Sequence, residues 1–306
     1  MRIRVLLAID GSSYSIMGAR MLKTLQPSAE ADVRLLTVVP EHTFLGGFTL
    51  QSVRGIRVGK EKSREAEERH AHGLLQEPAE VLRAAGFTVE SRVARGNPAA
   101  KILEQAREMQ ADLVVIGAKG TATSPRFPLG STAQKVMKYS STNVLLVREG
   151  PTTIRRVLVA TDGSAYSDEV TRFLLDLPLP GRTEVQVVAA LHSFVRPNGS
   201  GLMPGPRVDE RTLSQLRAAE ERAALALVEK WRNTIRDRGL DVSCMVLRGE
   251  PAEEILMAAD TFCPELIALG AKGLSASDSF LLGSVAQRVA RFSQFSVLLG
   301  RLRRAA

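Results

Sequence analysis

The sequence predicts an α/β protein made of two similar domains, each a parallel β-sheet with helices on both faces. Three observations support this fold class. Apolar runs of strand length alternate with longer amphipathic segments, an alternation typical of strand–helix–strand units. The same order of segments occurs twice along the chain. A length of 306 residues, 44% of them hydrophobic, suggests about two domains and suffices for two cores.

An internal repeat covers nearly the whole chain. The segment RVLLAIDGSSYS at 4–15 matches RVLVATDGSAYS at 156–167 in nine of twelve positions, an offset of 152 residues. ARGNPAAKIL at 94–103 corresponds to LRGEPAEEIL at 247–256, an offset of 153 residues. Because Gly150 and Pro151 interrupt strand-like sequence at the join, we place the domains at 1–150 and 151–306.

Both halves have the same predicted order of elements. In the first half, the first helix begins at the cap-like Ser12 and Ser13, and a later helix has Asn97 as N-cap and Pro98 at its first position. A Gly-rich loop is expected up to about residue 60, and Pro78 is expected to kink or break the long helix that follows. The expected strands are 2–9, 32–39, 87–94, 112–117 and 143–148, and the expected helices are 12–26, 62–85, 98–109 and 130–140.

Two segments share a spacing of three glycines although most of the residues between the glycines differ. They are GAKGTATSPRFPLGS at 117–131 and GAKGLSASDSFLLGS at 270–284, and each lies between a buried strand and a helix. In a doubly wound parallel sheet, ligands bind at the carboxyl ends of the strands. Glycines there let main-chain N–H groups approach a ligand, and the following helix N-terminus adds N–H donors and a partial positive charge. The spacing therefore predicts a phosphate-binding loop in each half.

Side chains near the first loop suit a ligand with phosphates and a sugar. Ser131 offers a hydroxyl donor, Lys119 and Arg126 offer cationic groups, and Asp10 can accept hydrogen bonds from ribose hydroxyls or an adenine amino group. Two plainer interpretations stay open: the glycines are ordinary turn residues, or Asp10 and Asp162 cap the helices that follow them.

The second loop is expected to bind phosphate more weakly than the first. It has Ser279 at the position of Arg126, and Asp278 stands beside it. A carboxylate near a triphosphate repels it unless a metal ion lies between them.

The motif Gly-2x-Gly-9x-Gly-(Ser/Thr), after an opening strand that ends in Asp-Gly-Ser, resembles the ATP-binding branch of the universal stress protein family, here as a tandem of two domains. The resemblance implies for each domain a Rossmann-like fold of five parallel strands in the order 3-2-1-4-5. It implies ATP, ADP or AMP as the ligand, together with Mg²⁺. The nucleotide-binding residues that follow are Ile9, Asp10, Val38, Ile116, Gly117, Lys119, Gly120, Arg126, Gly130, Ser131 and Thr132 in the first half, and Thr161, Asp162, Ala190, Leu269, Gly270, Lys272, Gly273, Gly283, Ser284 and Val285 in the second.

The resemblance also implies roles for these residues. The two aspartates contact the nucleoside, the main chain at Val38 and Ala190 touches adenine, and Ile116 and Leu269 line the base pocket. The glycines and the residues just after the last glycine surround the ribose and phosphates. Many family members have Ser-Arg or Ser-His between the first two glycines, whereas both halves here have Ala-Lys, a cation of different reach.

Two classes of function remain open from the sequence. The first is a non-catalytic, nucleotide-dependent stress-response or regulatory module. The alternative is a slow ATP-hydrolysing or nucleotidyl-transferring enzyme of the same adenine-binding fold group. No catalytic set stands out, because Ser131 and Ser284 have no nearby general base in the sequence and no Walker A loop occurs. The four histidines, which are His42, His70, His72 and His192, show no metal-ligand spacing.

Composition limits the cellular locations and the classes of binding partner that are expected for the chain. The net charge is +8, but the basic residues are dispersed and aromatics make up 5%, which argues against nucleic acid as a partner. No apolar run approaches the ~20 residues of a membrane span, and the N-terminus has the pattern of a strand rather than a signal peptide. Two cysteines without a CxxC motif fit the cytoplasm. We expect the two halves to form an intrachain pseudo-dimer through 143–148 and 296–300, and whole chains to form a homodimer.

Overall fold

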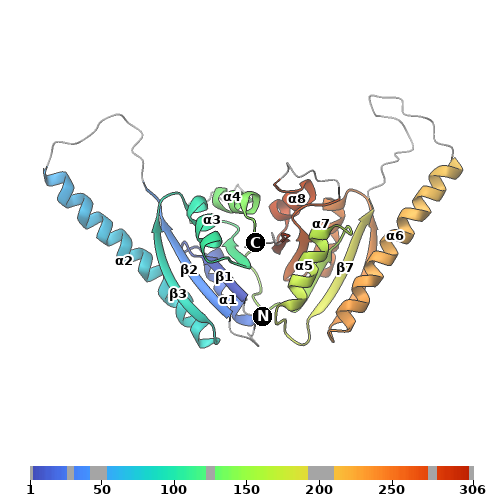
Figure 1. Ribbon diagram of the computed structural model, residues 1–306, viewed down its shortest axis with the longest axis horizontal. Coiled ribbons are helices and arrows are strands. Elements are labelled where there is room, and N and C mark those ends of the chain that lie inside the picture. Colours follow the sequence, from blue (N-terminus) through green and yellow to red (C-terminus); the bar gives the residue numbers. More distant parts are fainter. Residues whose placement is uncertain are drawn as a thin grey trace, which may run out of the picture. The chain divides into compact units, whose positions relative to one another are not determined.

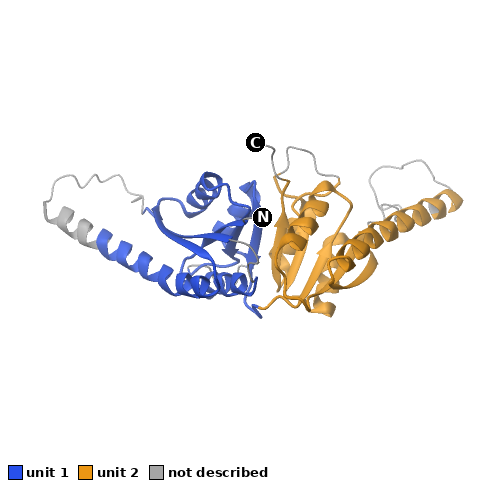
Figure 2. Cartoon of the chain, turned by 60° about the horizontal axis from the view of Figure 1, so that its bottom comes forward, with its two compact units in different colours: residues 1–152 blue, residues 153–306 orange. Residues whose placement is uncertain are grey.

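The computed structural model describes residues 3–25, 31–41, 54–121, 128–191, 210–274 and 281–302. The chain divides into two compact units, Met1–Thr152 and Thr153–Ala306 (Figure 2). In each unit, helices cover both faces of a β-sheet (Figure 1). The predicted α/β class is therefore confirmed.

Unit 1 contains five strands and four helices within its described residues. Each helix follows a strand, as expected for a doubly wound sheet. The elements are β1 (Ile3–Ala8), α1 (Ser13–Thr24), β2 (Ala31–Val39), α2 (Arg54–Ala84), β3 (Thr88–Arg95), α3 (Pro98–Glu108), β4 (Leu113–Gly117), α4 (Ser131–Tyr139) and β5 (Asn143–Val147).

Unit 2 repeats this order in the part of residues 153–306 that the structure describes. Its elements are β6 (Arg156–Ala160), α5 (Ala165–Asp176), β7 (Glu184–Leu191), α6 (Glu210–Arg236), β8 (Asp241–Arg248), α7 (Pro251–Phe262), β9 (Leu266–Gly270), α8 (Ser284–Phe292) and β10 (Ser296–Gly300).

All strand pairs within a unit are parallel. In unit 1, β1 lies between β2 and β4, which gives the order β3-β2-β1-β4-β5. In unit 2, β6 lies between β7 and β9, which gives β8-β7-β6-β9-β10. Each unit therefore has the strand order 3-2-1-4-5. In both, the chain reverses its direction of progress across the sheet next to the first strand.

The core of each unit explains why the strands are so apolar. Helices α1 and α2 pack together on one face of the unit 1 sheet, and α3 and α4 pack together on the other (Figure 1). A strand covered on both faces needs apolar side chains at nearly every position. Leu113–Gly117 meets this requirement, since its first four residues are all buried. The same holds for Leu266–Gly270 in unit 2.

The long helix of unit 1 differs from the sequence prediction in two respects. It begins at Arg54, inside the segment expected to be a loop, and it continues through Pro78 to Ala84 without interruption. The expected break at Pro78 is wrong. Pro78 lacks the N–H for an intrahelical hydrogen bond, which disfavours it inside a helix. Here its ring is buried against the core, and this packing offsets the local preference.

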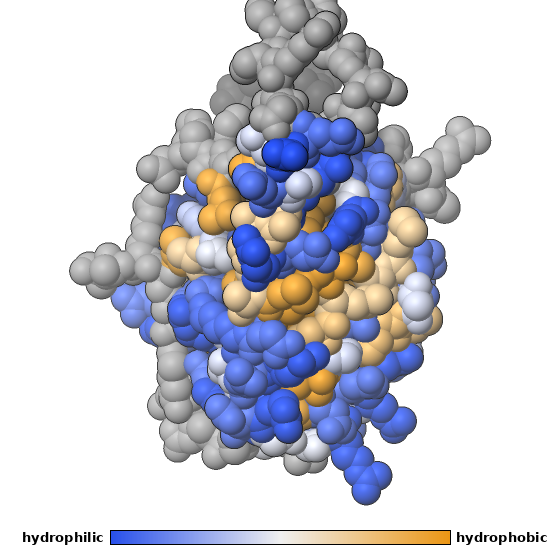
Figure 3. Space-filling view, turned by 90° about the vertical axis from the view of Figure 1, so that its right-hand side faces the viewer, coloured by the Kyte–Doolittle hydropathy of each residue, from blue (hydrophilic) through white to orange (hydrophobic). Residues whose placement is uncertain are grey.

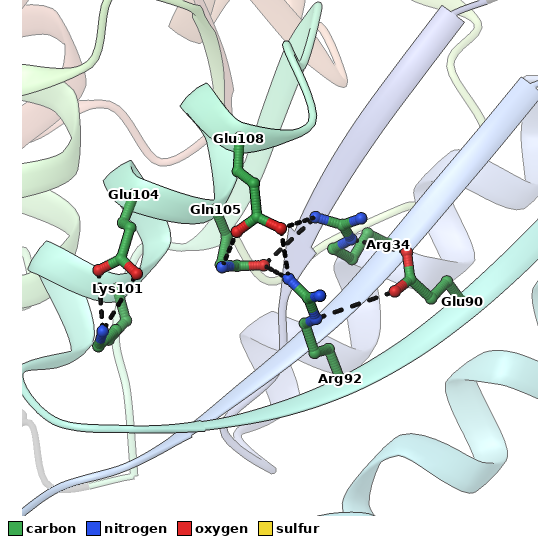
Figure 4. Close-up of polar contacts among 7 residues, drawn as sticks. All are labelled: Arg34, Glu90, Arg92, Lys101, Glu104, Gln105 and Glu108. Atoms are coloured by element: carbon green, nitrogen blue, oxygen red, sulfur yellow. Dashed lines mark hydrogen bonds and ion pairs between the residues drawn. The ribbon is translucent and has the colours of Figure 1, made fainter.

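The two units carry different side chains at equivalent positions of two strands and of the helix that covers them. In unit 1, Arg34, Glu90 and Arg92 on the strands converge with Gln105 and Glu108 of α3 in one polar network (Figure 4). An offset of 152 or 153 residues places uncharged residues there in unit 2, namely Gln186, Ser243, Met245, Ala258 and Thr261.

The side of the molecule at the right of Figure 1 shows apolar side chains gathered in a band between hydrophilic ones (Figure 3). Large apolar side chains of unit 2 with high exposure include Met245 at 47% and Met257 at 62%. The two units therefore share one fold but differ in the side chains on their surfaces.

Candidate functional site

The predicted site residues of unit 1 gather at the carboxyl ends of β1 and β4. Asp10 lies two residues beyond β1, and Gly117 is the last residue of β4. These two strands are hydrogen-bonded neighbours, so the turn after one faces the loop after the other. This is the point where the strand order reverses, the usual place for ligands in open α/β sheets.

Asp10 holds the turn after β1 and lies against the glycine loop. Its Oδ1 accepts hydrogen bonds from the main-chain N–H of Ser12 at 3.0 Å and from the Ser12 hydroxyl at 2.6 Å. The Ser12 hydroxyl also lies 3.3 Å from the carbonyl oxygen of Lys119. A Cβ atom on Gly120 would lie 2.6 Å from Asp10 Oδ2. Only a glycine at 120 allows the carboxylate this position.

Asp162 makes the equivalent contacts in unit 2. Its Oδ1 accepts a hydrogen bond from Ser164 N–H at 3.0 Å, and its Oδ2 accepts one from Leu274 N–H at 3.1 Å. A Cβ atom on Gly273 would lie 2.7 Å from the same Oδ2. Each aspartate thus holds the turn after the first strand and lies against the glycine loop after the fourth.

The alternative that these aspartates cap the following helices is wrong in its simple form. The N-cap residues of α1 and α5 are Ser12 and Ser164, and each hydroxyl accepts a hydrogen bond from the N–H three residues later. Asp10 and Asp162 instead hold the N–H groups of those capping serines.

The first glycine of each motif is needed for packing. A Cβ atom on Gly117 would lie 2.8 Å from Tyr14 Cβ and 3.1 Å from Ser15 N. On Gly270 it would lie 2.8 Å from Ser167 N. The first turn of α1 or α5 therefore contacts the end of the neighbouring strand directly, and no side chain fits between them.

The last glycine of each motif begins a helix that has no side-chain cap. Gly130 is the N-cap of α4 and Gly283 is the N-cap of α8, and neither helix has a side-chain hydrogen bond at its start. Four other described helix starts do have one, from Ser12, Asn97, Ser164 and Glu250. The first N–H groups of α4 and α8 are thus the ones left for an anionic ligand.

A pair of main-chain hydrogen bonds closes each loop at its base. In unit 1, Gly130 N–H donates to Ala118 O at 2.8 Å, and Ala118 N–H donates to Val147 O at 2.8 Å. In unit 2, Gly283 N–H donates to Ala271 O at 2.8 Å, and Ala271 N–H donates to Gly300 O at 2.9 Å. Both ends of the loop are therefore held beside the last strand of the unit.

The residues expected around a base occupy the neighbouring strand ends. Val38 and Ala190 lie near the ends of β2 and β7 and are partly exposed. Ile116 and Leu269 are 5% and 3% exposed, so their side chains belong to the core. Ile9 and Thr161 are also buried, and their N–H groups donate at 2.9 Å to strand residues Leu36 and Val188.

The predicted cationic and hydroxyl residues lie around the same loops. Lys119 and Lys272 are partly exposed, and Lys272 Nζ lies 5.8 Å from the centroid of the Tyr166 ring. Ser131 and Ser284 are exposed at the first position of their helices, and Thr132 and Val285 are partly exposed at the second. Arg126, Asp278 and Ser279 lie outside the described residues, as do His42 and His192.

Sequence reasoning missed one pair of residues at these loops. Arg148 follows β5 and its Nη1 donates to Pro128 O at 2.7 Å. Arg301 follows β10 and its Nη1 donates to Leu281 O. Burial lowers the pKa of both guanidinium groups, while Tyr14 and Tyr166 partly oppose that shift. Their offset of 153 residues, the same as that of the motifs, was the available signal.

The described residues show no metal-binding cluster. No three His, Cys, Asp or Glu side chains among them come together as metal ligands would. Cys244 is partly buried, and burial raises the pKa of its thiol. In the same part of the chain, no helix is both long and apolar enough to cross a lipid bilayer.

Comparison with known proteins gives a match over both halves. A family model described as the universal stress protein family matches residues 1–148 and 153–301. A curated universal stress protein of Mycolicibacterium smegmatis is 27% identical over 253 residues, which make up 78% of this chain and 79% of that protein.

A solved structure that aligns over nearly the whole chain shows the same fold. A universal stress protein from Archaeoglobus fulgidus aligns with a TM-score of 0.63 and 20% identity over 97% of this chain and 96% of its own. A universal stress protein in complex with cAMP matches 48% of this chain and 96% of its own, with 24% identity and a TM-score of 0.34. The cAMP complex is described for that protein.

Proposed function

Because the chain belongs to the universal stress protein family over both of its repeats, we propose that each repeat binds an adenine nucleotide, with ATP and Mg²⁺ as the ligand. Nucleotide binding in turn makes the chain a regulatory module of the stress response. The further parts of the proposal are that 1–150 and 151–306 act as two nucleotide-binding domains that form an intrachain pseudo-dimer in the cytoplasm.

A single feature carries the proposal: in each unit, the helix that follows the glycine motif begins without a side-chain cap, and a strand-end aspartate lies against the same glycine loop. Gly130 and Gly283 leave the first N–H groups of α4 and α8 to an outside acceptor. A phosphate group satisfies such N–H groups and is stabilised by the partial positive charge of the helix end. Asp10 and Asp162 stand at the other side of the glycine loops.

Different residues of the first site suit different parts of the nucleotide. The N–H groups of Ser131 and Thr132, with the Ser131 hydroxyl and Lys119, suit the phosphates of the first site. Asp10 Oδ2 suits the ribose hydroxyls, since each carboxylate oxygen accepts more than one hydrogen bond. Mg²⁺ would be held chiefly by phosphate oxygens and water, which is its usual mode of binding.

The most direct test is to identify what the purified protein carries. The chain is purified, denatured and filtered, and the released nucleotide is separated by chromatography and quantified per chain. We expect ATP at a stoichiometry above one per chain for two competent sites. Release of no nucleotide, together with no calorimetric heat on adding ATP and Mg²⁺, would exclude the proposal. Conversion of added ATP to ADP or AMP would favour the enzyme alternative.

A further inference from the structure

The arginine that follows the last strand of each unit contacts the end of the glycine loop. Arg148 and Arg301 occupy equivalent positions in the two repeats, and each donates from Nη1 to the carbonyl oxygen two residues before the N-cap glycine. The acceptor residues differ, Pro128 in unit 1 and Leu281 in unit 2. The contact is therefore repeated although the residue that supplies the carbonyl is not.

Both arginine side chains are at least partly buried, so their hydrogen bonds matter for stability. Arg301 is 7% exposed and Arg148 is partly buried. Placing a guanidinium group in the interior costs free energy unless hydrogen bonds satisfy its N–H groups. Neighbouring positions did diverge between the repeats: Glu149 in unit 1 corresponds to the exposed Leu302 in unit 2. An arginine that is at least partly buried thus stands at this position in both units, whereas the exposed residue after it differs.

The geometry of the peptide group links the arginine to the opposite side of the loop. In a trans peptide the C=O and the following N–H point in opposite directions. Fixing the carbonyl of Pro128 toward Arg148 turns the N–H of Leu129 away from the arginine. It also keeps this carbonyl from turning toward an anion at the helix end. The same holds for Leu281 and Arg301.

We propose that Arg148 and Arg301 are positioning residues for nucleoside polyphosphates, each aligning the end of its glycine loop so that main-chain N–H groups face the phosphates. Each arginine holds a carbonyl of the loop and does not itself contact the ligand. This inference rests on the proposed nucleotide binding and deepens it, because it names the polyphosphate moiety as the part of the ligand that the arginines serve.

The test compares a ligand that has phosphates with one that has none. Calorimetric titrations with ATP and Mg²⁺ and with adenosine are carried out on the full chain and on Arg148→Met, Arg148→Lys and Arg301→Met. We expect each Met variant to weaken ATP binding at one of two sites by about tenfold, because a charge-assisted hydrogen bond is lost. Adenosine affinity should change less than twofold, and Arg148→Lys should recover part of the ATP affinity. Arg107→Met, at an exposed position of α3, is the matched control and should change neither.

A measurement without ligand separates this inference from the proposed function. Amide hydrogen exchange of the nucleotide-free chain should be faster in the peptide that covers 128–134 of Arg148→Met, and unchanged in α3. If the wild-type chain binds neither ATP nor adenosine, the proposed function fails, while the exchange result still decides whether Arg148 aligns the loop. Unchanged ATP affinity and unchanged exchange would overturn the inference. An equal loss of ATP and adenosine binding with a lower melting temperature would also overturn it, since Arg148 would then support only the fold.

Discussion

At the scale of single residues, the glycines of each motif differ in what surrounds them. Gly117 lies against the first turn of α1, whereas Gly120 lies against the carboxylate of Asp10. Main-chain atoms of a packed helix cannot move aside cheaply, but a carboxylate can rotate away. Gly130 and Gly283 have φ values of −72°, so those positions do not require glycine for their backbone conformation. What glycine provides at these two positions is the absence of a side chain.

Alanine substitutions should separate these roles. Gly117→Ala should lower the free energy of unfolding by about 1–3 kcal/mol, because its Cβ would overlap Tyr14 and Ser15. Gly120→Ala should cost less stability but weaken nucleotide binding, because the new Cβ would displace Asp10 Oδ2. Urea unfolding and calorimetric titration measure the two effects.

Gly73→Ala is the matched control for these substitutions. Gly73 lies inside α2 with nothing within 4 Å of its added Cβ, so this change should stabilise the chain by up to about 1 kcal/mol. Equal losses of stability for Gly117→Ala and Gly120→Ala would contradict the distinction between a packing glycine and a ligand-loop glycine.

At the scale of elements, the polar network between α3 and the strands beneath it ties the helix to the sheet in unit 1. Arg92 donates to Glu108 at 2.8 Å, and Arg34 forms an ion pair with Glu90 at 2.8 Å across neighbouring strands (Figure 4). The hydrogen bond from Arg92 lowers the pKa of Glu108, with smaller contributions from Gln105 and Arg34. The same bond raises the pKa of Arg92.

This shift predicts a pH dependence of stability. Because the pKa of Glu108 is lower in the folded chain than its ordinary value, the bond stabilises the fold above that ordinary value. The stabilisation is lost as the pH falls through the folded-state pKa. We expect Glu108→Gln to reduce the slope of the unfolding free energy against pH between about pH 5 and pH 3.

The partner supplies the control for this prediction. In an Arg92→Met background, Glu108→Gln should change the slope much less, because the carboxylate has lost its main partner. Salt should weaken the effect, since Glu108 and Arg92 are solvent-exposed. An unchanged slope in Glu108→Gln would show that the ion pair contributes nothing measurable to folding.

At the scale of the whole molecule, the two repeats share the main elements of the proposed nucleotide site but differ in the charges of their loops. The strand-end aspartate, the three glycines, a lysine and the arginine after the last strand occur in both units. By sequence, the first loop adds Arg126, whereas the second adds Asp278. A like charge near the phosphates weakens binding by roughly 1 kcal/mol, or several-fold in affinity.

Single-site variants should reveal this asymmetry. In Gly283→Val the remaining first site should bind ATP more tightly than the second site that remains in Gly130→Val, and its affinity should fall more steeply with added salt. Calorimetry with ATP and Mg²⁺ at two ionic strengths measures both. Equal affinities would mean that main-chain geometry alone sets binding. A tighter second site would mean that Asp278 points away from the phosphates or holds the metal ion.

The sequence alone determined the features that depend on neighbours along the chain. The tandem repeat, the alternation of strands and helices, and the N-caps at Ser12 and Asn97 could all be predicted, because periodicity and capping involve residues only a few positions apart. The spacing of the glycines also located the loops at the strand ends, through a resemblance that the family match confirms.

Only the tertiary structure decided what those residues touch. Ser12 meets Lys119 across 107 positions, and Arg148 reaches Pro128 across 20, because strand register brings their segments together. Strand register cannot be predicted from local sequence patterns. Pro78 shows the converse, since a local signal for a break gave way to burial in the core. At Pro78, packing against residues distant in the sequence outweighs the local preference, and that packing exists only in the complete fold.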